Sequence, residues 1–216
     1  DFIVDKLRRG SGIQCTKDDI LVVSGSLQAL DLVNATLLSQ GDTVIVEESS
    51  YGGVFSRLKQ LKVNVVGIPV NDDGLDLNVL EDTLIDLGRK NVLPRYIYTI
   101  PTVQNPTGVI LPYDKRIKML ELSKKFGVPI FEDDCYADLL WGAERPASIR
   151  SLDEEGSVIY CGSFSKSVAP GFRVGYIVAD WNVLSRILPH KNDGGTGMLE
   201  QMILAEFCGN GFFAHL

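Results

Sequence analysis

Lys166 is the residue whose surroundings most favour covalent chemistry. It follows a short apolar run, Val158–Cys161, in a segment of Gly, Ser and Phe that carries no other charge. A lysine acts as a nucleophile through its neutral amine, and removal from water or a nearby cation lowers its pKa towards that form. Most lysines are solvated surface charges, so the setting makes Lys166 a candidate only.

Two further segments have the chemistry to bind an anion. Ser24-Gly25-Ser26 stands between an apolar run and a helical pattern, where backbone N–H groups and hydroxyls can hold a phosphate. The ordinary alternative is that Ser24 or Ser26 caps the helix. Arg173 lies seven residues after Lys166 and has a fixed fork of donors suited to phosphate, although it can equally pair with a surface carboxylate. The dinucleotide and Walker glycine motifs are both absent.

Four more polar residues stand next to apolar runs. Asp133 and Tyr136 follow Val128–Phe131, and alone they can be a helix cap and a rim aromatic. Asn105 precedes a proline, which is also typical of a simple turn. Tyr51 can be an exposed loop aromatic. Each residue is a weak signal by itself.

Apolar, β-branched runs alternate along the chain with segments of helical period. This alternation predicts a single α/β domain whose mostly parallel sheet is flanked by helices. The expected helices cover 27–38, 77–87 and 112–126, with a short one over 1–10 and two more closing the chain, the last running to Leu216. The expected strands cover 20–23, 43–46, 63–70, 96–100, 128–131, 158–161 and 173–179.

The joint position of these polar residues strengthens the case for a ligand site. Ligands of open parallel sheets bind beyond the carboxyl ends of the strands. Five predicted strands are followed there by small, polar or ionisable residues, so these loops are expected at one edge of the sheet. The sequence therefore predicts a ligand site at that edge.

Composition excludes several classes of function. The 216 residues have a net charge of −7, which argues against a broad nucleic-acid surface. No apolar run is long enough to span a membrane, and no secretory signal opens the chain. The four cysteines form no CxxC pair and the only histidines are His190 and His215, so no metal site is expected. Reduced thiols fit a cytoplasmic protein.

Taken together, these residues resemble the class I/II aminotransferases of the type I pyridoxal-phosphate fold. The match covers most of the chain, from about Ile20 to Gly175. The motifs that carry it are Ser24-Gly25-Ser26, Tyr51, Asn105-Pro106-Thr107-Gly108, Asp133-Asp134-Cys135-Tyr136, Ser163-Phe164-Ser165-Lys166, Arg173 and Gly175. The residues around these motifs are most similar to those of the aminoadipate, kynurenine and aromatic aminotransferase branch. The same module also forms the effector domain of some helix-turn-helix regulators.

The resemblance implies pyridoxal 5'-phosphate as cofactor and a role for each residue. Lys166 is expected to form the Schiff base and to move the substrate proton. Asp133 is expected to pair with the pyridine nitrogen, Tyr136 and Asn105 with the phenolate oxygen, and Tyr51 to stack on the ring. A cis Asn105–Pro106 bond is also implied. The expected phosphate ligands are Ser24, the amides of Gly25, Ser26 and Leu27, the Ser163 and Ser165 hydroxyls, and Arg173.

The function implied is transfer of an amino group from an α-amino acid to a 2-oxo acid by a homodimer. Residues 1–216 are expected to form the large cofactor-binding domain, truncated at both ends and a poor catalyst alone. The arginine that binds the substrate carboxylate in the family lies in the small domain, beyond this sequence. Three alternatives stay open: another pyridoxal-phosphate reaction, by a lyase or synthase, a regulator's effector domain, and a truncated or decayed copy with no activity.

Overall fold

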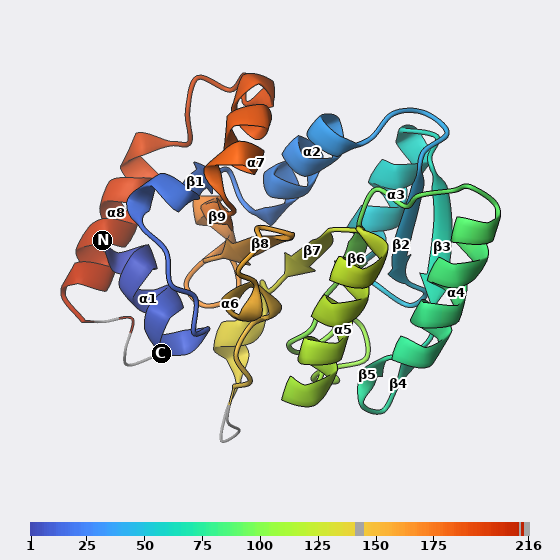
Figure 1. Cartoon of the computed structure of the whole chain (residues 1–216). Coiled ribbons are helices and arrows are strands. Elements are labelled where there is room, and N and C mark those ends of the chain that lie inside the picture. Colours follow the sequence, from blue (N-terminus) through green and yellow to red (C-terminus); the bar gives the residue numbers. More distant parts are fainter. Residues whose placement is uncertain (141–144, 212, 214–216) are drawn as a thin grey trace.

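A computed structural model describes residues 1–140, 145–211 and 213 (Figure 1). Its centre is a seven-stranded sheet in the order β1-β9-β8-β7-β6-β2-β3, and β4 and β5 form a separate two-stranded hairpin. The strands are β1 (Ile20–Val23), β2 (Thr43–Glu47), β3 (Asn64–Ile68), β4 (Val70–Asn71), β5 (Gly74–Leu75), β6 (Ile97–Thr99), β7 (Ile130–Asp133), β8 (Val158–Ser163) and β9 (Gly175–Val178).

The sheet is mostly parallel, as predicted. Strands β3, β2, β6, β7 and β8 pair in parallel. Strand β9 pairs antiparallel with both β8 and β1, so β1 runs in the same direction as β8. The carboxyl ends of β1, β2, β6, β7 and β8 therefore lie at one edge, where β9 begins.

Two strand predictions were wrong in detail. The expected strand 63–70 is interrupted at Pro69, which has no N–H for the ladder, and its last part pairs with β5 instead. The expected strand 173–179 begins only at Gly175. Arg173 has a left-handed φ of 50°, which lies outside the extended region.

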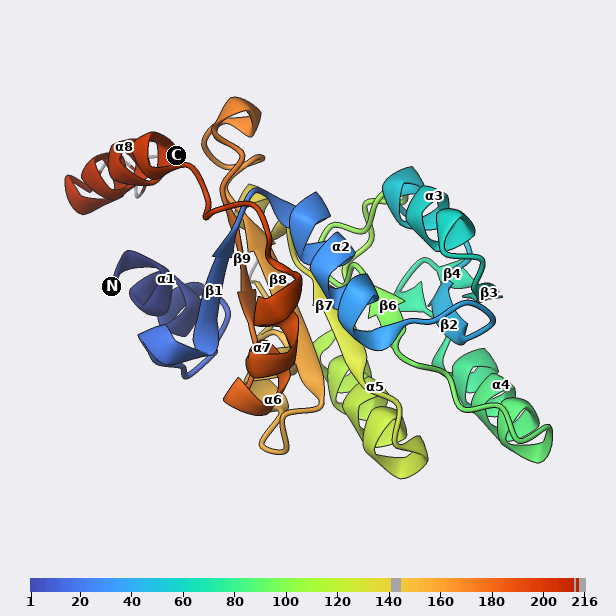
Figure 2. The same cartoon turned by 90° about the horizontal axis from the view of Figure 1, so that it is seen from above.

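Helices cover both faces of the sheet (Figure 2). The short helix at the start is confirmed, whereas α3 was not predicted. The last helix ends at Gly209, and 214–216 of its expected range, with His215, lie outside the described residues. The helices are α1 (Phe2–Gly10), α2 (Ser26–Leu37), α3 (Gly52–Gln60), α4 (Leu77–Arg89), α5 (Tyr113–Phe126), α6 (Ile149–Leu152), α7 (Trp181–Ile187) and α8 (Met198–Gly209).

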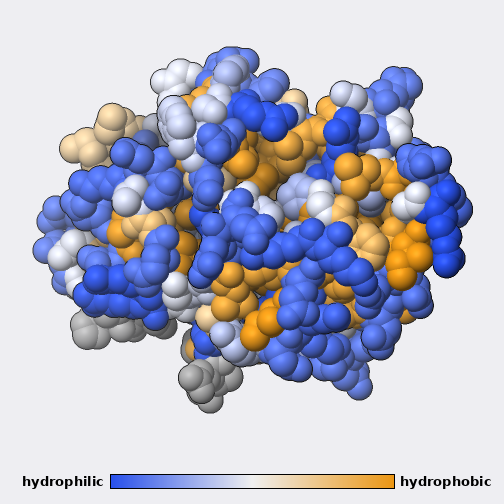
Figure 3. All heavy atoms as spheres, in the orientation of Figure 1, coloured by the Kyte–Doolittle hydropathy of each residue, from blue (hydrophilic) through white to orange (hydrophobic). Residues whose placement is uncertain are grey.

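Three buried apolar clusters hold these layers together. One joins the sheet to α2, α3 and α7, the second joins it to α4, α5 and α6, and the third lies against α1 and α8. On the face seen in Figure 3, hydrophobic residues show in several areas separated by hydrophilic ones. Burial on both faces explains why the strands read as continuous apolar runs.

None of the described helices has the length and apolar character needed to cross a bilayer. All four cysteines are free thiols.

Candidate functional site

Most of the predicted residues meet in one cleft at the sheet edge where β7 and β8 end. Its volume is about 130 Å³. Because β9 runs in the opposite direction, the residues just before it reach the same edge as those just after β8. Eight predicted residues line the cleft: Ser26, Leu27, Tyr51, Asp133, Tyr136, Ser165, Lys166 and Arg173.

Asp133 is the one carboxylate of its acidic triplet that faces this cleft. Side chains alternate between the faces of a strand, so Glu132 and Asp134 point away from Asp133. Glu132 accepts the backbone N–H groups of Ile149 (2.9 Å) and Arg150 (2.8 Å) at the start of α6. The alternation therefore decides which acidic residue serves the site.

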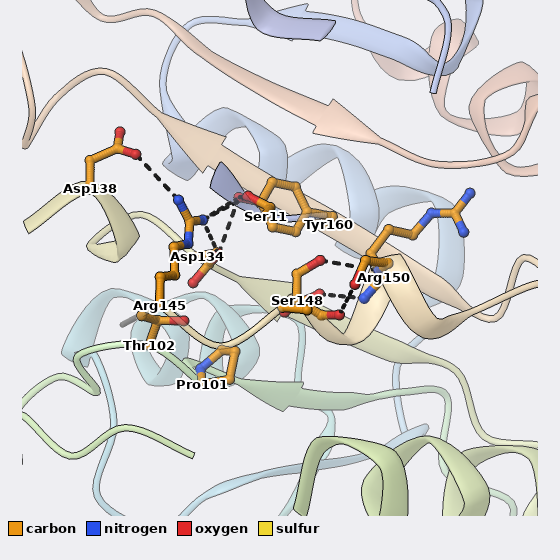
Figure 4. A network of polar contacts seen from close by, with 12 residues as sticks. Ser11, Pro101, Thr102, Asp134, Asp138, Arg145, Ser148, Arg150 and Tyr160 are labelled. Atoms are coloured by element: carbon orange, nitrogen blue, oxygen red, sulfur yellow. Dashed lines mark hydrogen bonds and ion pairs between the residues drawn. The ribbon is translucent and has the colours of Figure 1, made fainter. Parts of the chain in front are cut away.

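Asp134 instead belongs to a buried ion network on the other side of the sheet (Figure 4). Arg145 donates to it at 2.7 Å and to the Ser11 hydroxyl at 2.8 Å, and Tyr160 donates to it at 3.2 Å. Burial raises the pKa of Asp134, but Arg145 and Arg116 outweigh burial and hold it below its ordinary value. This network joins the loop after β7 to the residue that follows α1.

The Asp133 carboxylate is shielded and only partly satisfied. Oδ2 accepts the Tyr98 hydroxyl at 2.7 Å. Burial raises the pKa of Asp133, while hydrogen bonds from Cys135 and Tyr98 oppose the rise. Oδ1 is buried and has no hydrogen-bond partner in the described part of the chain. A buried carboxylate oxygen without a donor is costly, so this atom is matched to a ligand with an N–H group.

Lys166, Tyr136 and Asn105 form a second group in the site. Lys166 Nζ lies 5.5 Å from the centroid of the Tyr136 ring. Asn105 Nδ2 donates to the Tyr136 hydroxyl at 3.0 Å, and the Asn105–Pro106 bond is cis, as predicted. Lys166 itself is exposed. An amine, a phenol and an amide thus converge at the side of the cleft next to Asp133.

Glu47 fixes the turn that carries Asn105 through hydrogen bonds to residues just before it. This buried carboxylate accepts Thr99 Oγ1 at 2.7 Å and Gln104 Nε2 at 2.9 Å. The Gln104 side-chain oxygen in turn accepts the Thr107 N–H at 2.9 Å. Burial raises the pKa of Glu47 to about 7, although these donors favour its charged form. No short sequence pattern predicts this contact between Glu47 and the turn.

Arg173 and the start of α2 form the anion-binding end of the cleft. Arg173 Nη2 donates to the Ser24 carbonyl at 3.2 Å, and Nη1 donates to the Ser165 hydroxyl at 3.3 Å. Gly25 has a φ of 85°, and a Cβ there would lie 2.7 Å from Cζ of Arg173. The Ser26 and Leu27 amides are in the first turn of α2, whose N–H groups have no partner within the helix. A cation therefore stands beside free amides, as an anion site requires.

Three predicted phosphate ligands, Ser24, Gly25 and Ser163, lie outside the cleft lining. The Gly25 N–H donates to the Val23 carbonyl at 2.8 Å, so this predicted amide is already satisfied. The Ser24 hydroxyl faces Asp193 at 3.5 Å, so only its carbonyl takes part through Arg173. Ser163 is buried, and its hydroxyl accepts the Ser165 N–H at 3.1 Å. In this structure Ser24 and Ser163 shape the walls of the site.

Sequence reasoning missed several residues that meet the site. Leu30, Ile100, Cys135 and Pro170 line the cleft, and Tyr98 lies behind it. The sequence did contain a signal for Tyr98. It stands two residues before Ile100, which lines the cleft, and side chains two residues apart on a strand point to the same face of the sheet.

The four cysteines form no CxxC pair in the sequence, and Cys135 and Cys161 are 26 residues apart. The structure brings Cys135 and Cys161 together, with their sulfurs and an Asp133 oxygen within 4.8 Å of one another. A hydrogen bond with Cys161 and burial raise the pKa of the Cys135 thiol well above its ordinary value. We therefore interpret the protonated Cys135 thiol as a hydrogen-bond donor to Asp133.

A larger hollow of about 330 Å³ lies elsewhere, between α1, β1 and α8. Its lining is mainly apolar, with Phe2, Ile20, Val22 and Leu204 among the residues, and it contains none of the predicted site residues.

Comparison with known proteins identifies the family of the chain. The family model for class I and II aminotransferases matches residues 2–193. The chain belongs to this family. It is 35% identical over 212 residues to aromatic-amino-acid aminotransferase 1 of Thermococcus litoralis, which covers 97% of this chain and 51% of the relative. An uncharacterised helix-turn-helix transcriptional regulator of Bacillus subtilis is 33% identical, covering 99% of this chain and 43% of the relative.

The structural comparison gives the same fold. The α-aminoadipate aminotransferase of Thermus thermophilus, solved with N-(5'-phosphopyridoxyl)-L-leucine, superposes with a TM-score of 0.88 at 35% identity. The match covers 98% of this chain and 53% of that chain. The fold is thus the type I aminotransferase fold, and the predicted family is confirmed. The chain spans about half the length of the relatives it matches.

The cleft fits pyridoxal phosphate on its own chemistry. The unpartnered Oδ1 of Asp133 suits a protonated ring nitrogen, and the first turn of α2 with Arg173 suits a phosphate. The Lys166 amine lines the same cleft, as an aldehyde partner must.

Proposed function

We propose that this protein is a pyridoxal-phosphate-dependent aminotransferase, with Lys166 holding the cofactor as a Schiff base and residues 1–216 forming the cofactor-binding domain. Its substrates are an α-amino acid and a 2-oxo acid. The observation that carries the proposal is the buried, unpartnered Oδ1 of Asp133, a residue that lines the cleft together with Lys166 and Arg173. Asp134 Oδ1 is also buried without a partner, but Asp134 lies in the ion network on the other side of the sheet. Asp133 is distinguished by its place in the cleft lining beside Lys166 and Arg173.

Each side chain has a task that follows from its position. When bound, the cofactor supplies an electron sink for the α-carbon of the amino acid. Asp133 would hold a proton on the ring nitrogen, because a nearby negative charge favours it. Tyr136 and Asn105 would bind the phenolate oxygen, and Tyr51 would pack against the ring. The Lys166 amine would serve as the general base and acid that moves the α-proton of the amino acid.

The phosphate is held at the other end of the cleft. Arg173 supplies the positive charge and the amides of Ser26 and Leu27 supply neutral donors, with the Ser165 hydroxyl beside them. Gly25 leaves room for the guanidinium at this place. Contacts at both ends of the cleft would fix the plane of the ring relative to Lys166.

A spectroscopic experiment tests this proposal. The purified protein is mixed with pyridoxal phosphate, and its near-visible absorbance is recorded before and after borohydride reduction. We expect a Schiff-base band that is absent in Lys166→Ala and retained in the control Lys59→Ala, which removes an exposed lysine of α3. Wild-type protein without this band, or a band that persists in Lys166→Ala, would refute the proposal.

A second candidate function is the effector domain of a transcription regulator. It is favoured by the regulator of Bacillus subtilis, which matches 99% of this chain. In that case Lys166 would still bind the cofactor, so the band alone does not separate the two. Keto acid formed from a radiolabelled amino acid supports the transaminase, whereas a winged helix-turn-helix encoded upstream of Asp1 favours the regulator.

We also propose a homodimer in the cytoplasm that binds neither nucleic acid nor membrane. Helix α8 exposes a row of apolar side chains of the kind that subunit interfaces bury, namely Met198, Leu199, Met202 and Ile203. The net charge of −7 and the four free thiols support the other parts of this proposal.

A further inference from the structure

We infer that Tyr98 is a positioning residue of the site: its phenol fixes the Asp133 carboxylate so that Oδ1 faces the cleft, and it favours the ionised carboxylate. The inference rests on the proposed function, because it concerns how Asp133 meets the ring nitrogen. Tyr98 lies on β6, the strand beside β7, and is fully buried. It therefore acts through Asp133 and lies outside the lining of the cleft.

The geometry leaves the Tyr98 hydroxyl little choice of partner. Its 2.7 Å hydrogen bond to Oδ2 of Asp133 joins two neighbouring strands. The Tyr98 ring is held edge-on by Phe131, with centroids 5.6 Å apart and planes at 82°. Burial and the nearby Asp133 raise the pKa of Tyr98 well above its ordinary value, so the phenol stays a donor. A rigid donor from one side directs the opposite oxygen of the carboxylate towards the cleft.

The need for this donor comes from burial. Removal from water raises the pKa of Asp133, and a neutral carboxyl would no longer stabilise a protonated ring nitrogen. Apart from Tyr98, the donors to this carboxylate are the thiol of Cys135, which is a weak one, and the Cys135 backbone N–H, so Tyr98 is the one hydroxyl donor among them. Titratable or charged groups surround Asp133 on several elements. They are Tyr98 on β6, Cys161 on β8, Asp134 and Cys135 directly after Asp133 in the sequence, and Tyr51, Tyr136, Lys166 and Arg173 in the cleft lining.

The chain contains a matched control in Tyr96. This residue is on the same segment, is also fully buried, and packs edge-on against Phe131 at 6.0 Å. Its hydroxyl donates to Asn34 Oδ1 at 2.6 Å, away from Asp133. Tyr96→Phe and Tyr98→Phe therefore remove the same group from similar surroundings, and only Tyr98→Phe changes the site.

The experiment titrates the visible band of the Lys166 Schiff base against pH in wild type, Tyr98→Phe and Tyr96→Phe. A positive ring nitrogen lowers the pKa of the Schiff base by charge repulsion. We expect Tyr98→Phe to weaken Asp133 as a partner, so the midpoint rises by about one pH unit and cofactor affinity falls about tenfold. Tyr96→Phe is expected to match wild type in both measurements.

Other outcomes have distinct meanings. An unchanged midpoint in folded Tyr98→Phe, or an equal shift in Tyr96→Phe, overturns the inference and leaves the proposed function intact. Absence of the band in wild type would overturn the proposed function itself. Tyr98→His keeps a ring N–H donor, so its midpoint is expected closer to wild type than that of Tyr98→Phe. Circular dichroism shows whether each variant is folded.

Discussion

Replacement of Gly25 by alanine is the sharpest test of the anion-binding end of the cleft. Gly25 precedes α2 and has a φ of 85°, a conformation that residues with a Cβ rarely adopt. The added methyl would lie 2.7 Å from Cζ of Arg173, well inside contact distance. The change therefore adds backbone strain and also pushes the guanidinium out of its place.

The two effects have different sizes and different readouts. With φ 85° and ψ 167°, Gly25 lies in a region that is almost restricted to glycine, so a residue with a Cβ there costs about 1–3 kcal/mol, which lowers the free energy of unfolding. Displacement of Arg173 breaks its 3.2 Å hydrogen bond to the Ser24 carbonyl and removes a charged donor from the phosphate. A hydrogen bond to a charged group contributes about 1.5–3 kcal/mol, so cofactor affinity is expected to fall about 10- to 100-fold.

Urea unfolding without cofactor and a pyridoxal-phosphate titration measure these effects separately. Gly127→Ala is the matched control, because Gly127 ends α5 with a φ of 66° and its Cβ would have no atom within 4 Å. Because its conformation is left-handed helical, it should lose about 1–2 kcal/mol of stability and keep the wild-type affinity. An equal loss of affinity in both variants would show that strain alone weakens the site.

A double-mutant cycle then identifies Arg173 as the cause. If the methyl acts by displacing the guanidinium, Arg173→Ala lowers affinity by itself and adds little in the Gly25→Ala background. Additive losses of affinity would refute the reasoning, since Gly25 and Arg173 would then act independently.

Two further predictions concern groups that support the fold. Burial raises the pKa of Glu47 to about 7, so the folded chain holds a proton that the unfolded chain releases near its ordinary value. The contribution of protonated Glu47 to stability is complete below that ordinary pKa and is lost as the pH rises through 7. Relative to Glu47→Gln, the free energy of unfolding of wild type, measured with urea, should fall by about 3 kcal/mol between pH 4 and 8. A pH-independent difference would contradict this. Asp76 caps α4 by accepting the N–H groups of Asn78 and Val79, so Asp76→Ala should lower the free energy of unfolding by about 1 kcal/mol, and an unchanged urea midpoint would refute the cap's contribution.

The order of the elements was readable from the sequence because each signal is local. Apolar runs gave the strands, and the polar residues after them gave the edge of the sheet where the cleft lies. Helix α3 was missed because its first residues, Gly52 and Gly53, are typical of a turn. In the structure Gly53 leaves room for the Tyr51 ring, since a Cβ there would lie 2.7 Å from Cζ of that ring. The packing of the aromatic ring thus overrides the low helix propensity of glycine.

The contacts behind the cleft had no local signal. Tyr98 and Asp133 are 35 residues apart, and Cys161 is further still, yet register places all three on adjacent strands. Which donors a buried carboxylate meets depends on register across the sheet, and a single sequence does not encode register in any short pattern. The same holds for Glu47 and Gln104, whose contact fixes the turn that carries Asn105.

The reversed direction of β9 brings Arg173 to the same edge of the sheet as Asp133 and Lys166. If β9 ran parallel to its neighbours, the residues before it would lie at the other edge, about 13 Å away along a four-residue strand. Arg173 would then lie far from Gly25 and Lys166. The reversal also needs small residues, because a Cβ on Gly175 would lie 3.0 Å from the Gly162 carbonyl and 3.1 Å from Gly25. The parallel strands therefore place Asp133 and Lys166, and the one antiparallel strand between β1 and β8 adds the positive charge for the phosphate.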